Sequence, residues 1–261
     1  MAMLRDKEHG CPWDRKQNFQ TIAPHTLEEA YEVVDTIERE DYVHLANELG
    51  DLLFQVVFYA QLGQEAGYFD FDDIVSEIGN KLLVRHPHVF PDATIESFGV
   101  QKSVTSEQVE GNWEKIKHSE RQDKEGSQSS VLDDIPLAFP ALTRARKIQK
   151  RAANMGFDWP DHTGVMDKIQ EEFRELQEAI AQNSPENIEE ELGDMFFSLV
   201  NLSRHLKVDP ETSMRKANDK FEKRFRSLEA RVAAEDIILE GMSLELLEEY
   251  WQSVKNSEKG S

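Results

Sequence analysis

The 261-residue chain has a single cysteine, Cys11. One thiol excludes an intramolecular disulfide, and with it the class of small secreted domains built on disulfides. The longest apolar run, residues 52–60, is interrupted by Gln55 and is too short to span a bilayer. The opening residues, MAMLRDKEHG, are charged and lack an apolar segment, so we expect no signal peptide. These absences predict a cytoplasmic protein that has no association with a membrane.

Basic residues are also scarce. The chain has 30 Lys and Arg against 51 Asp and Glu, a formal net charge of −21. This balance opposes stable nucleic-acid binding, because affinity for a phosphate backbone comes from Lys and Arg. The sequence has no Gly-rich phosphate-binding loop of the Walker type and no convincing alternation of apolar and polar residues. We therefore expect an all-α protein in which metal ions and side chains, rather than backbone amides, would hold any phosphates.

Acidic residues stand at helical spacing on either side of a turn at residues 183–185. Residues three apart are neighbours on one helix face, so an antiparallel hairpin would bring four carboxylates together: Glu172, Glu175, Glu191 and Asp194. Such a cluster is unfavourable unless a cation lies among the carboxylates. Oxygen ligands suit Mg²⁺, with Mn²⁺ as the alternative. A di-iron site is disfavoured because the sequence contains no Glu-x-x-His.

The competing interpretation is that these acids form a solvated helix face. Two observations oppose it: Leu192, Met195 and Phe196 share the second helix with the acids, and the whole pattern occurs twice. An upstream set lies at a constant offset of 143 residues: Glu29, Glu32, Glu48 and Asp51. An internal repeat of this length indicates two domains of one plan.

Each acidic set is followed by a Lys-x-x-x-Arg pair and a tryptophan. These are Lys81, Arg85 and Trp113 upstream and Lys220, Arg224 and Trp251 downstream. Lys and Arg can neutralise phosphates, and an aromatic face can stack on a base, although Trp251 could equally belong to the core. The opening loop GCPWD is open to two interpretations, as an N-terminal packing loop or as part of a site.

The repeat predicts two tandem helical-bundle domains, residues 1–118 and 131–261, joined by a polar linker at 119–130. Helices are expected at 26–39, begun by a capping box at Thr26, and at 41–66, 71–83 and 106–118. The second domain would hold an acidic hairpin at 164–206 and helices at 209–233 and 244–255. A basic helix around 144–151 either binds phosphates or is a solvated face.

Together these motifs resemble the MazG family of bacterial nucleoside triphosphate pyrophosphohydrolases along nearly the whole chain: GCPWD, HTLEEAYEV, ELGDLLFQVVFYAQ, RHPHVF, DDIP, KIQKRAANMGFDW, EEELGD and KANDKFEKRF. The resemblance implies an all-α NTP pyrophosphatase fold, dependence on Mg²⁺ and a homodimer. It implies hydrolysis of NTPs and dNTPs to the monophosphate and pyrophosphate, with the second domain active. It also implies a GTPase as a partner protein.

Residue by residue, the resemblance assigns the metal to Glu172, Glu175, Glu191 and Asp194. It assigns nucleotide contacts to three segments and Trp251: Lys168, Ile169, Gln170, Glu171 and Glu172; Asn187, Ile188, Glu189 and Glu190; and Lys220, Phe221, Glu222, Lys223 and Arg224. Asn187 departs from the Lys of close relatives. Either Glu171 or Glu190 would orient the attacking water, and Lys220 and Arg224 would stabilise the leaving pyrophosphate.

The sequence also favours the second domain on its own grounds. Lys168 carries a fixed charge one turn before Glu171, whereas the matching upstream residue is His25. A hypothesis from another class is a non-catalytic regulator that senses a metal or nucleotide and binds a partner protein. Turnover of NTP by the pure protein separates this regulator from an enzyme.

Overall fold

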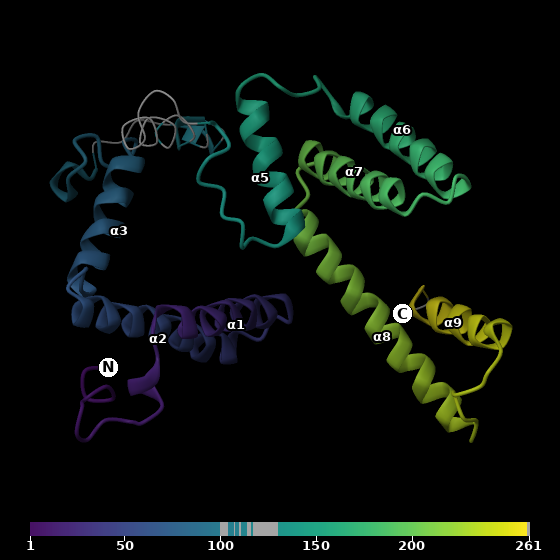
Figure 1. Ribbon diagram of the computed structural model, residues 1–261, viewed down its shortest axis with the longest axis horizontal. Coiled ribbons are helices and arrows are strands. Elements are labelled where there is room, and N and C mark those ends of the chain that lie inside the picture. The colour runs from purple at the N-terminus through teal and green to yellow at the C-terminus, as the bar shows by residue number, and fades with distance from the viewer. Residues whose placement is uncertain (100–103, 107, 110, 114–115, 117–129, 260–261) are drawn as a thin grey trace. The chain divides into compact units, whose positions relative to one another are not determined.

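The computed structural model describes residues 1–99, 104–106, 108–109, 111–113, 116 and 130–259. Every regular element in this part of the chain is a helix, which confirms the all-α prediction. The chain forms two compact units, Met1–Gly126 and Ser127–Ser261 (Figure 1). Their boundary falls within the stretch predicted as a linker, but residues 119–129 lie outside the described part. The linker and the domain limits therefore stay predictions.

The first unit is built on a helical hairpin. Its elements are η1 (Asp14–Lys16), α1 (Phe19–Glu38), α2 (Tyr42–Ala66), α3 (Phe71–Arg85) and η2 (Ile95–Ser97). Helix α1 packs against α2, and α3 packs against α2. Gly67 ends α2 in a left-handed conformation with φ 73°, a backbone geometry that costs glycine little. Ile22, Phe58 and Leu62 form the buried core between α1 and α2.

Helix α1 begins seven residues before the expected start at Thr26, so that prediction was wrong. The capping box is formed by Asn18, whose side chain accepts from the Thr21 amide, while the Thr21 hydroxyl accepts from the Asn18 amide. Thr26 lies inside the helix and its hydroxyl lies 3.0 Å from the Tyr59 hydroxyl. The reciprocal cap at Asn18 and the burial of Ile22 start the helix earlier, and the helix continues through Pro24.

The second unit contains α5 (Ala141–Asn154), α6 (His162–Ala181), α7 (Pro185–His205), α8 (Pro210–Ala234) and α9 (Leu244–Lys259). Helices α6 and α7 form the predicted acidic hairpin. Pro185 stands in the first turn of α7, where its missing N–H has no cost. Helix α5 packs against α7 and α8, and α9 folds back along α8 (Figure 1).

Helix α5 contains the basic residues predicted around 144–151. Arg146 forms an ion pair with Asp209 at 2.6 Å. The Lys147 ammonium lies 5.1 Å from the centre of the Phe139 ring. Arg151 donates hydrogen bonds to the carbonyls of Val131 and Asp133. These three cations therefore hold α5 to its own unit.

Two further expectations concern the rest of the chain. Six of the thirteen residues in the helix expected at 106–118 lie outside the described part, and those that are described are helical. None of the described helices is long and apolar enough to cross a membrane.

Phe58 offers a test of the core of the first unit. Its side chain is 0% exposed, meets Phe54 edge-on at 5.9 Å and lies beneath the Arg5 guanidinium. We expect Phe58→Ala to lower the free energy of unfolding by about 3–5 kcal/mol, because the surrounding residues fill only part of the cavity that the substitution leaves. The control is Tyr68→Ala, at a position 76% exposed. Equal urea midpoints for the two variants would contradict this core.

Candidate functional site

The predicted acids of the second unit meet where α6 and α7 pack together. Carboxylate oxygens of Glu172, Glu175 and Glu191 all lie within 4.8 Å of one another. Glu172 is only 3% exposed, so its charge needs a partner. Asp194, the fourth predicted ligand, lines the same hollow as Glu172. The hairpin thus places all four predicted residues in one region.

The cluster is electrostatically unfavourable in the metal-free protein. Burial raises the pKa of Glu175, and repulsion from Glu172 raises it further. The pKa of Glu191 is raised by burial and by the charges of Glu175, Glu172 and Asp194. A bound cation would reverse both shifts, because an opposite charge favours ionised carboxylates.

Lys168 is the cation that the sequence places beside this cluster. Its ammonium lies 2.6 Å from Glu171 Oε1 and 2.8 Å from Glu172 Oε1. Hydrogen bonds to Glu171 and Glu172 raise the Lys168 pKa, so the side chain carries its charge at every physiological pH. One turn of α6 therefore combines a fixed positive charge with the buried carboxylate.

Next to the acids the second unit has a cavity of about 500 Å³, within the range of about 300–1,000 Å³ usual for small-molecule sites. Its charged lining residues are Asp158, Lys168, Glu172, Asp194 and Arg204. The remaining wall combines apolar and aromatic groups with buried amides and a hydroxyl: Leu132, Ile148, Gln149, Ala152, Phe157, Trp159, Phe197, Ser198 and Asn201.

Close packing positions the aromatic part of this wall. Trp159 lies against the first turn of α6 at Gly164, where an added Cβ would collide with the indole. Burial disfavours the charge of the adjacent Asp158, but hydrogen bonds from Arg204 and His205 outweigh it and lower the Asp158 pKa. The loop before α6 is thereby tied to the end of α7.

The first unit contains a smaller version of this site. Oxygens of Glu29, Glu48 and Asp51 lie within 4.8 Å of one another, and burial, with repulsion from Asp51 and Glu32, raises the pKa of Glu29. The adjoining cavity is about 260 Å³, and Trp13 and His25 contribute to its lining. The opening loop therefore takes part in a site-like pocket as well as in packing.

Two residues of α2 account for much of the difference in volume. At the offset of 143, Phe58 replaces Asn201 and Gln55 replaces Ser198. Phe58 fills its side of the pocket, and Gln55 Nε2 donates to Glu29 Oε1 at 3.4 Å. In the first unit, therefore, a side chain of the same unit already contacts one of the clustered carboxylates.

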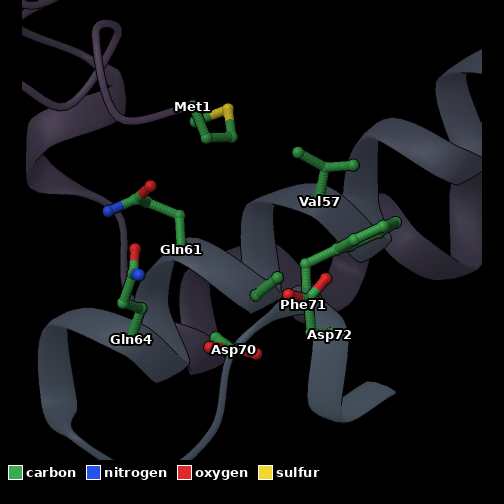
Figure 2. A pocket seen from close by; sticks show the side chains of 8 residues that line it. Met1, Val57, Gln61, Gln64, Asp70, Phe71 and Asp72 are labelled. Carbon is green, nitrogen blue, oxygen red and sulfur yellow. The ribbon is translucent and has the colours of Figure 1, made fainter. Parts of the chain in front are cut away.

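Figure 2 shows another hollow of the first unit, of about 250 Å³. Its lining includes Met1, Gln61 and the start of α3. The Asp70 carboxylate accepts from the Asp73 amide as the cap of α3. This hollow contains neither of the two acidic clusters.

The predicted cations of α8 lie on a different helix pair. Arg224 forms an ion pair with Glu258 of α9 at 2.7 Å. Trp251 packs on Phe221 with ring centres 5.2 Å apart, and it borders the core of Leu228, Val232 and Val254. The α8–α9 pair thus contains the predicted nucleotide contacts Lys220, Phe221, Glu222, Lys223, Arg224 and Trp251, whereas the predicted metal ligands lie on α6 and α7. Asn187, Ile188, Glu189 and Glu190 lie in the first two turns of α7, before Glu191, and Ile169 and Gln170 follow Lys168 on α6.

Sequence reasoning missed the inner wall of the large cavity. Trp159 left a usable signal, because Gly10-x-x-Trp13 recurs as Gly156-x-x-Trp159 ahead of the second acidic hairpin. Gln149 left none, because a glutamine on a basic helix looks solvent-exposed until that helix is packed against α7.

The acidic cluster predicts how stability depends on pH and metal. A raised carboxylate pKa means that, above the ordinary value of 4.5, the folded state retains protons that the unfolded chain has released. Stability from this source falls as pH rises through the folded pKa. We expect Glu191→Gln to melt higher than the wild type in EDTA at neutral pH, and the gap to close below about pH 4.

Added Mg²⁺ should raise the melting temperature of the wild type more than that of this variant, because an ion that binds only the folded form adds about 2.7 kcal/mol at 100 times its Kd. Glu178→Gln, on the same hairpin but outside the cluster, is the control. If both variants behave alike, the carboxylates do not form a strained cluster.

Comparison with known proteins agrees with this geometry. The MazG nucleotide pyrophosphohydrolase domain matches residues 17–90 and 161–228, one match in each unit. A nucleoside triphosphate pyrophosphohydrolase of Escherichia coli K12 is 53% identical over 99% of this chain and 95% of its own length. A nucleoside triphosphate pyrophosphohydrolase/pyrophosphatase MazG of Thermotoga maritima is 42% identical over 99% of this chain and 94% of its own.

YabN of Bacillus subtilis, a protein without an assigned activity, is 40% identical over 97% of this chain but only 50% of its own length. Both matched segments of this chain contain an acidic hairpin, and the downstream one includes Lys168 and the four predicted ligands. The chain is therefore a hydrolase that belongs to the MazG family of nucleotide pyrophosphohydrolases.

Proposed function

We propose that this chain hydrolyses nucleoside triphosphates, both NTPs and dNTPs, to nucleoside monophosphate and pyrophosphate in its second unit. The observation that carries the proposal is that Lys168 and members of the acidic cluster line a cavity that apolar and aromatic side chains also line. A triphosphate and a base attached to one sugar would meet these two sets of side chains together. The names of the similar proteins from E. coli and T. maritima support the same reaction.

The donor set fits a hard divalent cation. Glu172, Glu175, Glu191 and Asp194 offer only oxygen, and burial together with mutual repulsion raises the pKa values of Glu175 and Glu191 although Lys168 is close by. We assign Mg²⁺ to these four residues, with Mn²⁺ as an alternative ion. When bound, such an ion polarises phosphoryl oxygens and promotes ionisation of a water.

Other charged residues on α6 and α7 would bind a phosphate and orient the attacking water. Lys168 would exchange its contact with Glu172 for a phosphate oxygen once the cluster is neutralised. Lys168 already holds Glu171 at 2.6 Å, so we assign to Glu190 the orientation of the water that attacks the α-phosphorus. The apolar wall excludes bulk water, which strengthens every electrostatic contact with the phosphates.

The cations of α8 would act on the leaving pyrophosphate from a second copy of the chain. The acidic hairpins leave apolar residues on their outer faces at matching positions: Leu49 48%, Leu53 56%, Leu192 41% and Phe196 48% exposed. Such faces favour a homodimer in which hairpins pack together. We propose that Lys220 and Arg224, with Phe221 and Trp251, reach the partner's phosphates in that assembly.

Product analysis tests the reaction directly. We expect AMP and pyrophosphate from ATP with Mg²⁺, and a loss of at least about 100-fold in kcat for Glu172→Gln and for Asp194→Asn, because each removes an ionic oxygen ligand. Glu178→Gln should keep wild-type turnover. ADP and orthophosphate as the first products would refute attack at the α-phosphorus, and near-normal turnover of either ligand variant at saturating Mg²⁺ would refute the ligand assignment.

The two halves should differ in activity. We expect residues 131–261 to hydrolyse NTPs as a dimer and residues 1–118 to be much weaker, because the upstream pocket has half the volume and His25 in place of Lys168. The matched full-length variants are Glu29→Gln and Glu172→Gln. If Glu29→Gln abolishes turnover while Glu172→Gln leaves it intact, the first unit is the active one.

A further inference from the structure

Each unit places a tryptophan in the cavity beside its acidic cluster. Trp13 lines the smaller cavity together with Glu29, and Trp159 lines the larger one together with Glu172. Neither tryptophan belongs to an acidic hairpin, since Trp13 precedes η1 and Trp159 precedes α6. A residue outside the helices keeps its position only through contacts with the rest of its unit. Each tryptophan therefore needs an anchor.

In the second unit the anchor is Asp158. Its Oδ1 accepts hydrogen bonds from the Trp159 amide at 3.0 Å, from His205 Nε2 at 3.0 Å and from Arg204. The side chains of Asp158, Arg204 and His205 are between 12% and 23% exposed, so water screens these contacts less than it screens a surface ion pair. Arg204 and His205 end α7. Asp158 thus connects the backbone of the cavity tryptophan to an acidic helix.

The first unit makes the corresponding connection with different residues. Arg5 Nε and Nη2 donate to the two oxygens of Glu65, near the end of α2, at 2.9 and 2.7 Å. Arg5 Nη1 donates to the carbonyls of Asp14 and Gln17, which follow Trp13. The tryptophan segment of the first unit is therefore held to the end of α2, as that of the second unit is held to the end of α7.

The two anchors do not correspond through the repeat. At the offset of 143, Glu65 aligns with Val208 and Arg204 aligns with Gln61. The basic partner also lies before the first hairpin helix in one unit and on the second hairpin helix in the other. Two copies that share their acids have thus reached the same connection from unrelated positions. This indicates that the position of the tryptophan matters to the cavity beside it.

We infer that Asp158 is a positioning residue that holds Trp159 in place to contact the substrate within the large cavity. The inference rests on the proposed function, since it concerns how the nucleotide of that reaction is bound. Trp159 contacts the substrate, and Asp158 acts only through Trp159. An aromatic side chain that is already fixed in its binding position loses less conformational entropy when the ligand arrives, so the ligand binds more tightly.

The first test compares the two anchors in the full-length chain. For Asp158→Ala we expect the KM for ATP to rise at least about fivefold with kcat within about twofold, because binding weakens while the metal ligands are unchanged. Asp158→Asn keeps Oδ1 as an acceptor and should lie between this variant and the wild type. Glu65→Ala removes the anchor of the first unit and should keep the wild-type KM. An unchanged KM in Asp158→Ala, or an equal rise in Glu65→Ala, overturns the inference.

The second test asks whether Asp158 acts through Trp159. Trp159→Ala alone should raise KM at least as much as Asp158→Ala, and adding Asp158→Ala to it should change KM by less than about twofold. Gly164→Ala reaches the same side chain by another route, because the new Cβ would collide with the indole. It should raise KM with the ion pair intact. Independent effects of the two alanine substitutions, or a wild-type KM in Gly164→Ala, contradict the positioning role.

Binding of α,β-methylene ATP separates this inference from the proposed reaction, because its CH₂ group replaces the oxygen of the bond that would break. We expect its calorimetric Kd to rise in Asp158→Ala by the same factor as the KM for ATP. A chain that shows this rise but hydrolyses no ATP keeps the role of Asp158 and loses the pyrophosphohydrolase assignment. A chain that hydrolyses ATP and whose Kd is the same with and without Asp158 keeps the reaction and overturns the inference.

Discussion

Repulsion among carboxylates held at one helix seam is the constraint on which the site depends. Helices α6 and α7 bury Glu172 and bring Glu175 and Glu191 to it because three-residue spacing places each pair of acids on one face. The packing of the other residues of the hairpin compensates for this repulsion, and Lys168 offsets part of the negative charge. What remains is an uncompensated negative charge, the condition under which a divalent cation binds well.

The same hairpin occurs twice, but the surroundings give the two copies different chemistry. In the second unit α5 packs against α7 and contributes Ile148, Gln149 and Ala152 to a cavity whose lining combines charged, polar, aliphatic and aromatic side chains. In the first unit the chain before α1 supplies no such helix, and Arg5 instead bridges Glu65 and the carbonyl of Gln17. The acids that both copies share thus produce a carboxylate cluster in each hairpin, whereas the added helix shapes the larger pocket.

The positions of the Lys and Arg side chains also matter for a phosphate-binding site. A chain of net charge −21 repels a triphosphate unless cations are held where the phosphates lie. Arg146 of α5 is paired with Asp209 at the start of α8, and Arg224 is paired with Glu258. Lys168 differs from these cations because one of its two partners, Glu172, belongs to the acidic cluster.

The sequence by itself determined the helical class, the repeat, the hairpin turn at 183–185 and the acids that converge there. These properties can be read directly from the sequence, because helical periodicity and a constant offset between two copies need no knowledge of tertiary contacts. It misplaced the start of α1, since the capping box forms at Asn18, one turn before the buried Ile22, and not at Thr26. Only the tertiary structure decided that α5 lies against α7, that Gln149 is buried, and that Phe58 fills the upstream pocket. Those facts depend on contacts between residues dozens of positions apart, and side-chain spacing within one helix carries no information about which other helix will cover it.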